Sequence, residues 1–225
     1  MTICAIDFTI SWDYIAGFMP EIWDGFFTSL KIFGIVLFCG FFIAIIIAAL
    51  KAYGPKLVRS ILGVYTWMFR GTPLVLQLML VYYGFPYIGI TFQEGIVVAV
   101  IIMTLSAAAY EAEIIRGGLI SIDKGQFEAS KALGMTFLQT LRRVVVPQTV
   151  RRVLAPSCSE VIILFKDTSL VTSIAVYDLL RRASGRAGYD FTIEPYIVAL
   201  IFYLVFSSIL VIVFNRLEKR YSVSL

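Results

Sequence analysis

The chain has 225 residues, of which 60% are hydrophobic, a net charge of +4 and a mean hydropathy of +0.89. Soluble domains hold roughly 45–50% apolar residues, so this composition indicates a membrane protein, built as one domain of several helices. The absence of histidine removes the usual acid–base group near neutral pH and the commonest metal ligand. Cys4, Cys39 and Cys158 are too far apart to suggest a metal cluster or a disulfide framework.

The N-terminal segment, 1–25, contains acidic residues but no Lys or Arg. It therefore lacks the basic region of a cleaved signal peptide, and the first span is expected to stay uncleaved. From Trp12 to Phe26, apolar side chains recur at steps of three and four residues. This spacing predicts either an interfacial helix on the outer face or a helix packed on neighbouring spans.

About 20 apolar residues are needed to cross a hydrocarbon core of ~30 Å. The sequence predicts an all-α integral membrane protein with five transmembrane helices, at roughly 26–50, 60–85, 95–116, 150–172 and 195–215. A loop at 117–149 separates the third and fourth spans, and a tail at 216–225 follows the fifth. Glu113 and Arg116, at the inner end of the third span, are spaced to pair on a helix, and we interpret them as structural.

Basic residues concentrate on the side of the membrane where a chain is made. Here they cluster after the first span, in the loop 117–149 and its flanks, and in the tail 216–225, whereas the opposite side has only Arg181, Arg182 and Arg186. This distribution predicts an N-terminus outside and a C-terminus in the cytoplasm.

The loop 117–149 is too long for a simple turn. Asp123 followed by Gln126 is typical of a capping box, and Gly134 is a natural left-handed stop. We therefore expect a short amphipathic helix between Asp123 and Gly134. Periodicity alone does not distinguish a helix that binds a partner from one that lies flat on the bilayer.

Three ionisable residues, Arg70, Glu160 and Lys166, lie where hydrocarbon is expected. Burying them without compensation would cost on the order of 8–10 kcal/mol, unless they neutralise one another or reach the interface. Arg70 precedes Gly71-Thr72-Pro73, a sequence that interrupts a helix. Broken helices at membrane depth mark binding sites in other transporters, so the set favours a substrate site.

A free amino acid matches this set of charges. Arg70 and Lys166 are candidates to receive the α-carboxylate, and the guanidinium fork suits a two-point contact. Glu160 would bind the other end, since six helical residues place it about 9 Å from Lys166, the length of an extended basic amino acid. Further lining candidates, each with helix capping or interhelical hydrogen bonding as its alternative role, are Thr72, Gln77 and Asp167.

Five segments resemble the polar amino acid uptake branch of ABC importer permeases, and they occur in the order of that branch. They are FRGTPL (Phe69 to Leu74), AYEAEIIRGG (Ala109 to Gly118), KGQFEASKALG (Lys124 to Gly134), VVPQ (Val145 to Gln148) and KDTSL (Lys166 to Leu170). The chain departs from the family where Ser130 replaces a usual alanine and Ala155 a common leucine.

The resemblance implies a type I ABC importer-like permease core in a bacterial cytoplasmic (inner) membrane. Its EAA motif would form a coupling helix that docks an ATPase through Phe127, Glu128, Ala129, Leu133 and Gly134. The chain has no GxxxxGK[ST] loop, so it is not expected to be an enzyme or to hold a cofactor. ATP and Mg²⁺ would be bound by two separate ATPase subunits. The other implied partners are a second permease copy or paralogue, a soluble amino acid receptor and the substrate.

Permeases of this family for arginine, histidine and lysine carry a glutamate in a segment similar to Ser157–Ile163, although often with asparagine in place of Ser159. Glu160 therefore favours a basic substrate. Glutamine or another neutral polar amino acid is the alternative. A self-sufficient secondary transporter would explain the membrane charges but not the long loop, and a structural scaffold would explain the spans but not Arg70 with Glu160.

Overall fold

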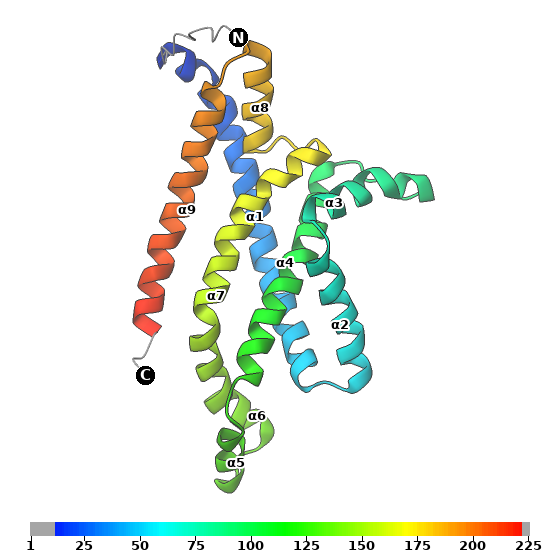
Figure 1. Cartoon of the computed structure of the whole chain (residues 1–225), viewed down its shortest axis with the longest axis vertical. Coiled ribbons are helices and arrows are strands. Elements are labelled where there is room, and N and C mark those ends of the chain that lie inside the picture. The colour runs from blue at the N-terminus through cyan, green and yellow to red at the C-terminus, as the bar shows by residue number, and fades with distance from the viewer. Residues whose placement is uncertain (1–11, 222–225) are drawn as a thin grey trace, which may run out of the picture.

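The structure is a computed structural model that describes residues 12–221. Every regular element in this range is helical (Figure 1). The α-helices are α1 (Trp12–Tyr53), α2 (Lys56–Gly71), α3 (Leu74–Met79), α4 (Gly95–Ile120), α5 (Lys124–Ala132), α6 (Phe137–Thr140), α7 (Val146–Asp167), α8 (Leu179–Asp190) and α9 (Glu194–Tyr221). Shorter π and 3-10 turns are η1 (Leu80–Gly84), η2 (Phe85–Ile88), η3 (Leu141–Val145) and η4 (Thr168–Ile174).

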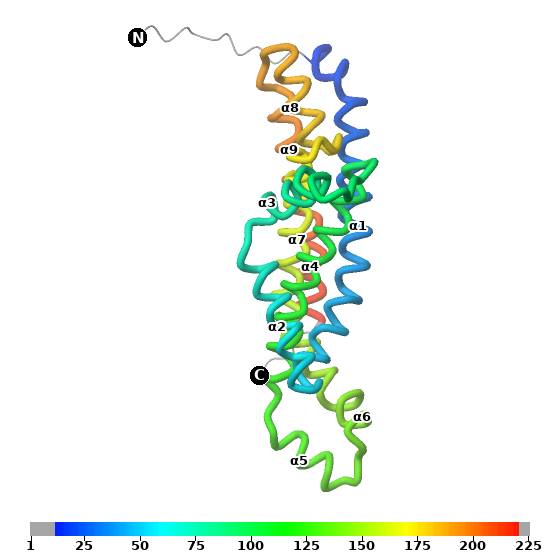
Figure 2. The backbone as a smooth tube through the Cα atoms, turned by 90° about the vertical axis from the view of Figure 1, so that its right-hand side faces the viewer, coloured from blue at the N-terminus to red at the C-terminus, as the bar shows by residue number. Residues whose placement is uncertain are grey.

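The long helices α1, α2, α4, α7 and α9 run along the long axis of the molecule (Figure 1). The start of α1 lies beside α8 at one end, which we call the α8 end, and α5 with α6 forms the opposite end, the α5 end (Figure 2). The segment from α3 to η2 projects sideways from the bundle. The termini of the described chain point toward opposite ends of the molecule.

Three helices, α1, α4 and α9, are long and apolar enough to cross a membrane in the part of the chain that the structure describes. The predicted count of five transmembrane helices is therefore not confirmed. The second predicted span is divided between α2 and the apolar segment Leu74–Ile88. The fourth is divided between α7, which carries several charged residues, and the 3-10 turn η4.

The predicted interruption of the second span is confirmed. Helix α2 ends at Gly71, and Thr72 and Pro73 are extended before α3 begins. Side chains replace the lost helical hydrogen bonds: the Thr72 hydroxyl donates to the Met68 carbonyl at 2.9 Å, and the Gln77 amide donates to the Phe69 carbonyl at 2.9 Å. The gap in backbone pairing is thus capped from within the segment.

The first turns of α1 are packed on neighbouring helices, which is the second of the two arrangements that the spacing allowed. Phe18 and Ile22 are fully buried against residues of α8 and α9, among them Leu179 and Val198. No separate interfacial helix occurs within residues 12–25, since α1 is continuous through them. Residues 1–11 lie outside the described part of the chain.

Helix α8 is held against α1 by close approach and by a buried cap. A Cβ at Gly25 would come within 2.8 Å of the Asp178 carbonyl oxygen, so only glycine allows this approach. The fully buried Asp178 carboxylate accepts hydrogen bonds from the Arg181 amide at 3.0 Å and the Thr172 hydroxyl at 2.6 Å. Burial raises the pKa of Asp178 despite these donors.

Candidate functional site

A polar cavity of about 170 Å³ lies where the broken span meets α4 and α7. The break supplies Thr72, α4 supplies Ser106 and Tyr110, and α7 supplies Glu160 and Asp167. Apolar side chains complete the lining: Leu74, Met103, Ala107, Ile163 and Leu164. The structure therefore brings together Thr72, Glu160 and Asp167, which the sequence places far apart or on different spans.

The two carboxylates of this cavity lack cationic partners. Glu160 and Asp167 are half-buried, and neither forms an ion pair or a side-chain hydrogen bond in residues 12–221. A carboxylate away from water is stable only when a proton, a donor or a cation compensates it. The cavity thus has the electrostatic character of a site for a cation.

A second cavity of about 290 Å³ lies on the other side of Glu160 and is mostly apolar. Glu111 of α4 lines it, is buried, and accepts a hydrogen bond from the Ser157 hydroxyl at 2.5 Å. Sequence analysis did not select Glu111. The available signal was an acidic residue inside the apolar stretch 95–116 with no basic residue three or four positions after it, where helix geometry would allow an ion pair.

Other candidates do not reach the polar cavity. Lys166 is exposed, and Gln77 lies across the helix break, beside an apolar groove of about 1060 Å³ that runs along α2, α3 and α4. The guanidinium of Arg70 lies over the ring of Tyr110, 5.5 Å from its centre, and is not among the residues that line the cavity. Arg70 thus contacts Tyr110, which lines the cavity beside the carboxylates.

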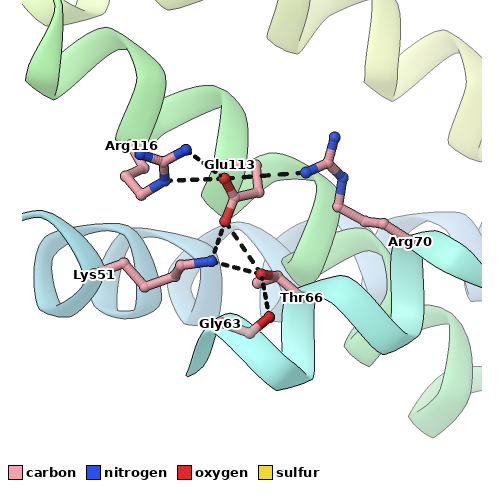
Figure 3. Close-up of polar contacts among 6 residues, drawn as sticks. All are labelled: Lys51, Gly63, Thr66, Arg70, Glu113 and Arg116. Carbon is pink, nitrogen blue, oxygen red and sulfur yellow. Dashed lines mark hydrogen bonds and ion pairs between the residues drawn. The ribbon is translucent and has the colours of Figure 1, made fainter. Parts of the chain in front are cut away.

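Arg70 belongs instead to a charge network around Glu113 (Figure 3). Glu113 pairs with Lys51 of α1 and, at 2.7 and 2.9 Å, with Arg116 of its own helix. From α2, the Thr66 hydroxyl donates a hydrogen bond to the Glu113 carboxylate at 3.2 Å, and the Arg70 guanidinium lies 4.0 Å from that carboxylate. The predicted Glu113–Arg116 pair is confirmed, and the network joins α1, α2 and α4 near the α5 end.

The helix expected between Asp123 and Gly134 is confirmed as α5 (Lys124–Ala132). The Asp123 carboxylate accepts from the Gly125 amide at 2.6 Å, and Gly134 has a φ of 73°. Gln126 does not complete a capping box, because its side chain accepts a hydrogen bond from Gln148 at 3.1 Å.

The five residues proposed for coupling do not share one face of α5. Phe127 is half-buried and packs against an apolar cluster that includes Ile122 and Val145. Glu128, Ala129 and Leu133 are exposed, and the Leu133 side chain is 82% exposed. Phe127 therefore anchors α5 to the bundle, and the other side chains are available to a partner.

Residues 20–223 match the family described as the binding-protein-dependent transport system inner membrane component. The chain belongs to this family. It is 37% identical to the arginine transport system permease protein ArtQ of Bacillus subtilis (strain 168), over 90% of this chain and 93% of the relative. It is 34% identical to the probable glutamine ABC transporter permease protein GlnP of the same organism, over 92% and 99%.

The fold is also that of a solved amino acid ABC transporter with histidines, with a TM-score of 0.86, 29% identity, and coverage of 94% of this chain and 99% of the other. The chain is thus the transmembrane subunit of an amino acid ABC importer. Such subunits are transport components and not catalysts. These relatives differ in the substrate that they are named for, so the family does not fix the substrate of this chain.

Proposed function

We propose that this permease subunit moves a basic amino acid, arginine, lysine or histidine, into the cytoplasm by alternating access. The observation that carries the proposal is the polar cavity at the helix break, where Glu160 and Asp167 face a space lined also by hydroxyl groups and have no cationic partner in the described chain. A guanidinium or ammonium group would neutralise either carboxylate, whereas an acidic side chain would be repelled.

The substrate would lie along α7, with its side chain at Glu160 and Asp167 and its α-carboxylate at a cation. Arg70 and Lys166 are the candidate cations, with Thr72 as a hydroxyl partner. Arg70 reaches the cavity only if its side chain leaves the ring of Tyr110. Gln77 would act indirectly, because its amide caps the helix break that exposes Thr72.

Five segments would cross the bilayer, two of them as broken helices: α2 with the segment through η2, and α7 with η4. The α8 end would face outward and receive substrate from a soluble receptor, and the α5 end would face the cytoplasm. The basic residues exposed near α5 and η3, such as Lys131, Arg142 and Arg143, support this orientation.

Two ATPase subunits would bind and hydrolyse ATP with Mg²⁺ and contact α5 through Glu128, Ala129 and Leu133. Gly134 ends this helix, and Phe127 would transmit its movement to α1 and α7. A second permease copy or a paralogue would cover the apolar groove beside α2 and α3, which includes the exposed side chains Leu76, Leu80 and Tyr87. ATP-driven closure would open the spans outward, and hydrolysis would return them inward.

The experiment is equilibrium binding of arginine, lysine, histidine and glutamine to the importer assembled with its ATPase in lipid. Wild type and Glu160→Gln are compared. Basic ligands should bind to the wild type and lose about 1.5–3 kcal/mol in the variant, as expected for a charge-assisted hydrogen bond. Preferential binding of glutamine, unchanged by the substitution, would favour the neutral alternative, for which the likeness to a glutamine permease is the present support.

A further inference from the structure

We propose that Glu113 is the resting partner of Arg70, and that the α-carboxylate of the substrate displaces it. Glu113 is then a positioning residue that sets how readily Arg70 turns toward the polar cavity. This inference rests on the proposed function, because it takes Arg70 as the receptor for the substrate carboxylate. It assigns a role in binding to Glu113, which its spacing from Arg116 alone marked as structural.

The charges around Glu113 are unbalanced. Three cations, Lys51, Arg70 and Arg116, surround the single carboxylate of Glu113 (Figure 3). No other acidic side chain of the described residues pairs with any of the three. The network is therefore short of negative charge, and an additional anion would stabilise it.

The three cations differ in how tightly Glu113 holds them. Arg116 forms two hydrogen bonds with one oxygen of Glu113, and Lys51 is 11% exposed and bonded to the other. Arg70 is 4.0 Å from Glu113, beyond hydrogen-bond distance, and 45% exposed. Arg70 is the most weakly held and the most accessible, so it is the cation that an incoming carboxylate can recruit.

The Arg70 side chain lies next to a residue that lines the polar cavity. The Arg70 guanidinium lies over the ring of Tyr110, and that ring also lines the cavity with Glu160 and Asp167. A rotation about the Arg70 side-chain bonds would bring the guanidinium from this ring into the cavity that the ring lines. The backbone at this point is anchored, because the Tyr110 hydroxyl donates to the Arg70 carbonyl at 3.3 Å. Only the side chain needs to move.

The test uses the assembled importer in lipid and two probe pairs, arginine with argininamide and glutamine with glutaminamide. Each amide replaces the α-carboxylate by a neutral group, and binding is measured at a mildly acidic pH so that its α-ammonium group stays protonated. Wild type should bind the acid about tenfold or more tightly than its amide, and Arg70→Gln should abolish that preference. Glu113→Gln should lower the Kd of the acid by about twofold to fivefold, the size expected for a half-exposed ion pair, and leave the Kd of the amide unchanged.

The effect must act through Arg70. In an Arg70→Gln background, Glu113→Gln should therefore change neither Kd, whereas a general effect of removing one negative charge would persist. If Glu113→Gln alone does not fold, Lys51→Met with Glu113→Gln removes the buried cation and the carboxylate together and should show the same tightening.

The outcomes separate the two proposals. Binding of no amino acid by wild type would overturn the proposed function. Binding with an acid preference that survives Arg70→Gln would overturn Arg70 as the receptor and this inference with it. Weaker or unchanged binding of the acid in a folded Glu113→Gln importer would show that Glu113 is structural only.

Discussion

Two groups of carboxylates on neighbouring faces of the bundle differ in how they are compensated. Glu113 is shared by three cations that join three helices, whereas Glu160 and Asp167 face a cavity without an ion pair in the described residues. Both groups are at least partly withdrawn from water, where an uncompensated charge is costly. A carboxylate with cationic partners contributes to the structure, and a carboxylate without them at a cavity is available to a ligand.

The largest expected effect comes from removing the Glu113 carboxylate, which has cationic partners. Glu113→Ala leaves Lys51, which is 11% exposed, without its partner. Loss of one member of a buried pair costs about 3–5 kcal/mol, so thermal unfolding in detergent should shift strongly downward. Lys51→Met combined with Glu113→Gln should recover most of that loss. Equal stability of Glu113→Ala and wild type would show that the network does not hold the helices together.

Removing the Glu160 carboxylate, which has no cationic partner in the described residues, should affect ligand binding and not stability. Glu160→Gln should leave thermal unfolding nearly unchanged, because no cation of the protein loses a partner. Binding of a basic ligand should weaken by about 1.5–3 kcal/mol, measured by calorimetry on the assembled importer. Asp167→Asn is the matched variant at the same cavity. A stability loss without a binding loss at both positions would place these carboxylates among the structural ones.

Asp178 sharpens the comparison because hydrogen-bond donors compensate its carboxylate instead of cations. Asp178→Ala removes the cap of α8 and should destabilise the protein by about 0.5–2 kcal/mol. Asp178→Asn keeps an acceptor and should cost less. Since burial raises the pKa of Asp178, its contribution to stability declines as pH rises, and the relative stability of Asp178→Asn should increase with pH. A stability difference between Asp178→Asn and wild type that stays constant from about pH 4 to about pH 8 would contradict this prediction.

Local features of this fold were predictable from sequence, and side-chain direction was not. The helix break at Gly71 to Pro73, the α5 helix and the Glu113–Arg116 pair follow from short-range rules of backbone and spacing. The direction of the Arg70 side chain depends on Glu113 and Tyr110, which lie on another helix. No periodicity in the second span carries that information.

The count of five spans is not confirmed, for a related reason. Apolar content marks α1, α4 and α9, but broken or charged segments such as α7 depend on neighbouring helices for compensation. Glu111 was missed because its partner, Ser157, is on α7, 46 positions away along the chain. Pairings between helices decide which charges are structural, and a single sequence does not contain them.

The smallest expected effect on the protein itself is at the exposed face of α5. Leu133→Ser changes a side chain that is 82% exposed, so stability should stay within about 0.5 kcal/mol of wild type. Co-purification of the ATPase and substrate-stimulated ATP hydrolysis should nevertheless fall. Phe127→Ala on the same helix is the opposite control, because its ring packs on the bundle and its loss should lower thermal stability. If Leu133→Ser keeps full coupling of ATP hydrolysis to substrate, the ATPase does not depend on this exposed side chain. The contact must then lie on another face of α5, and the division of the helix between Phe127 on the bundle and Leu133 on the partner would be wrong.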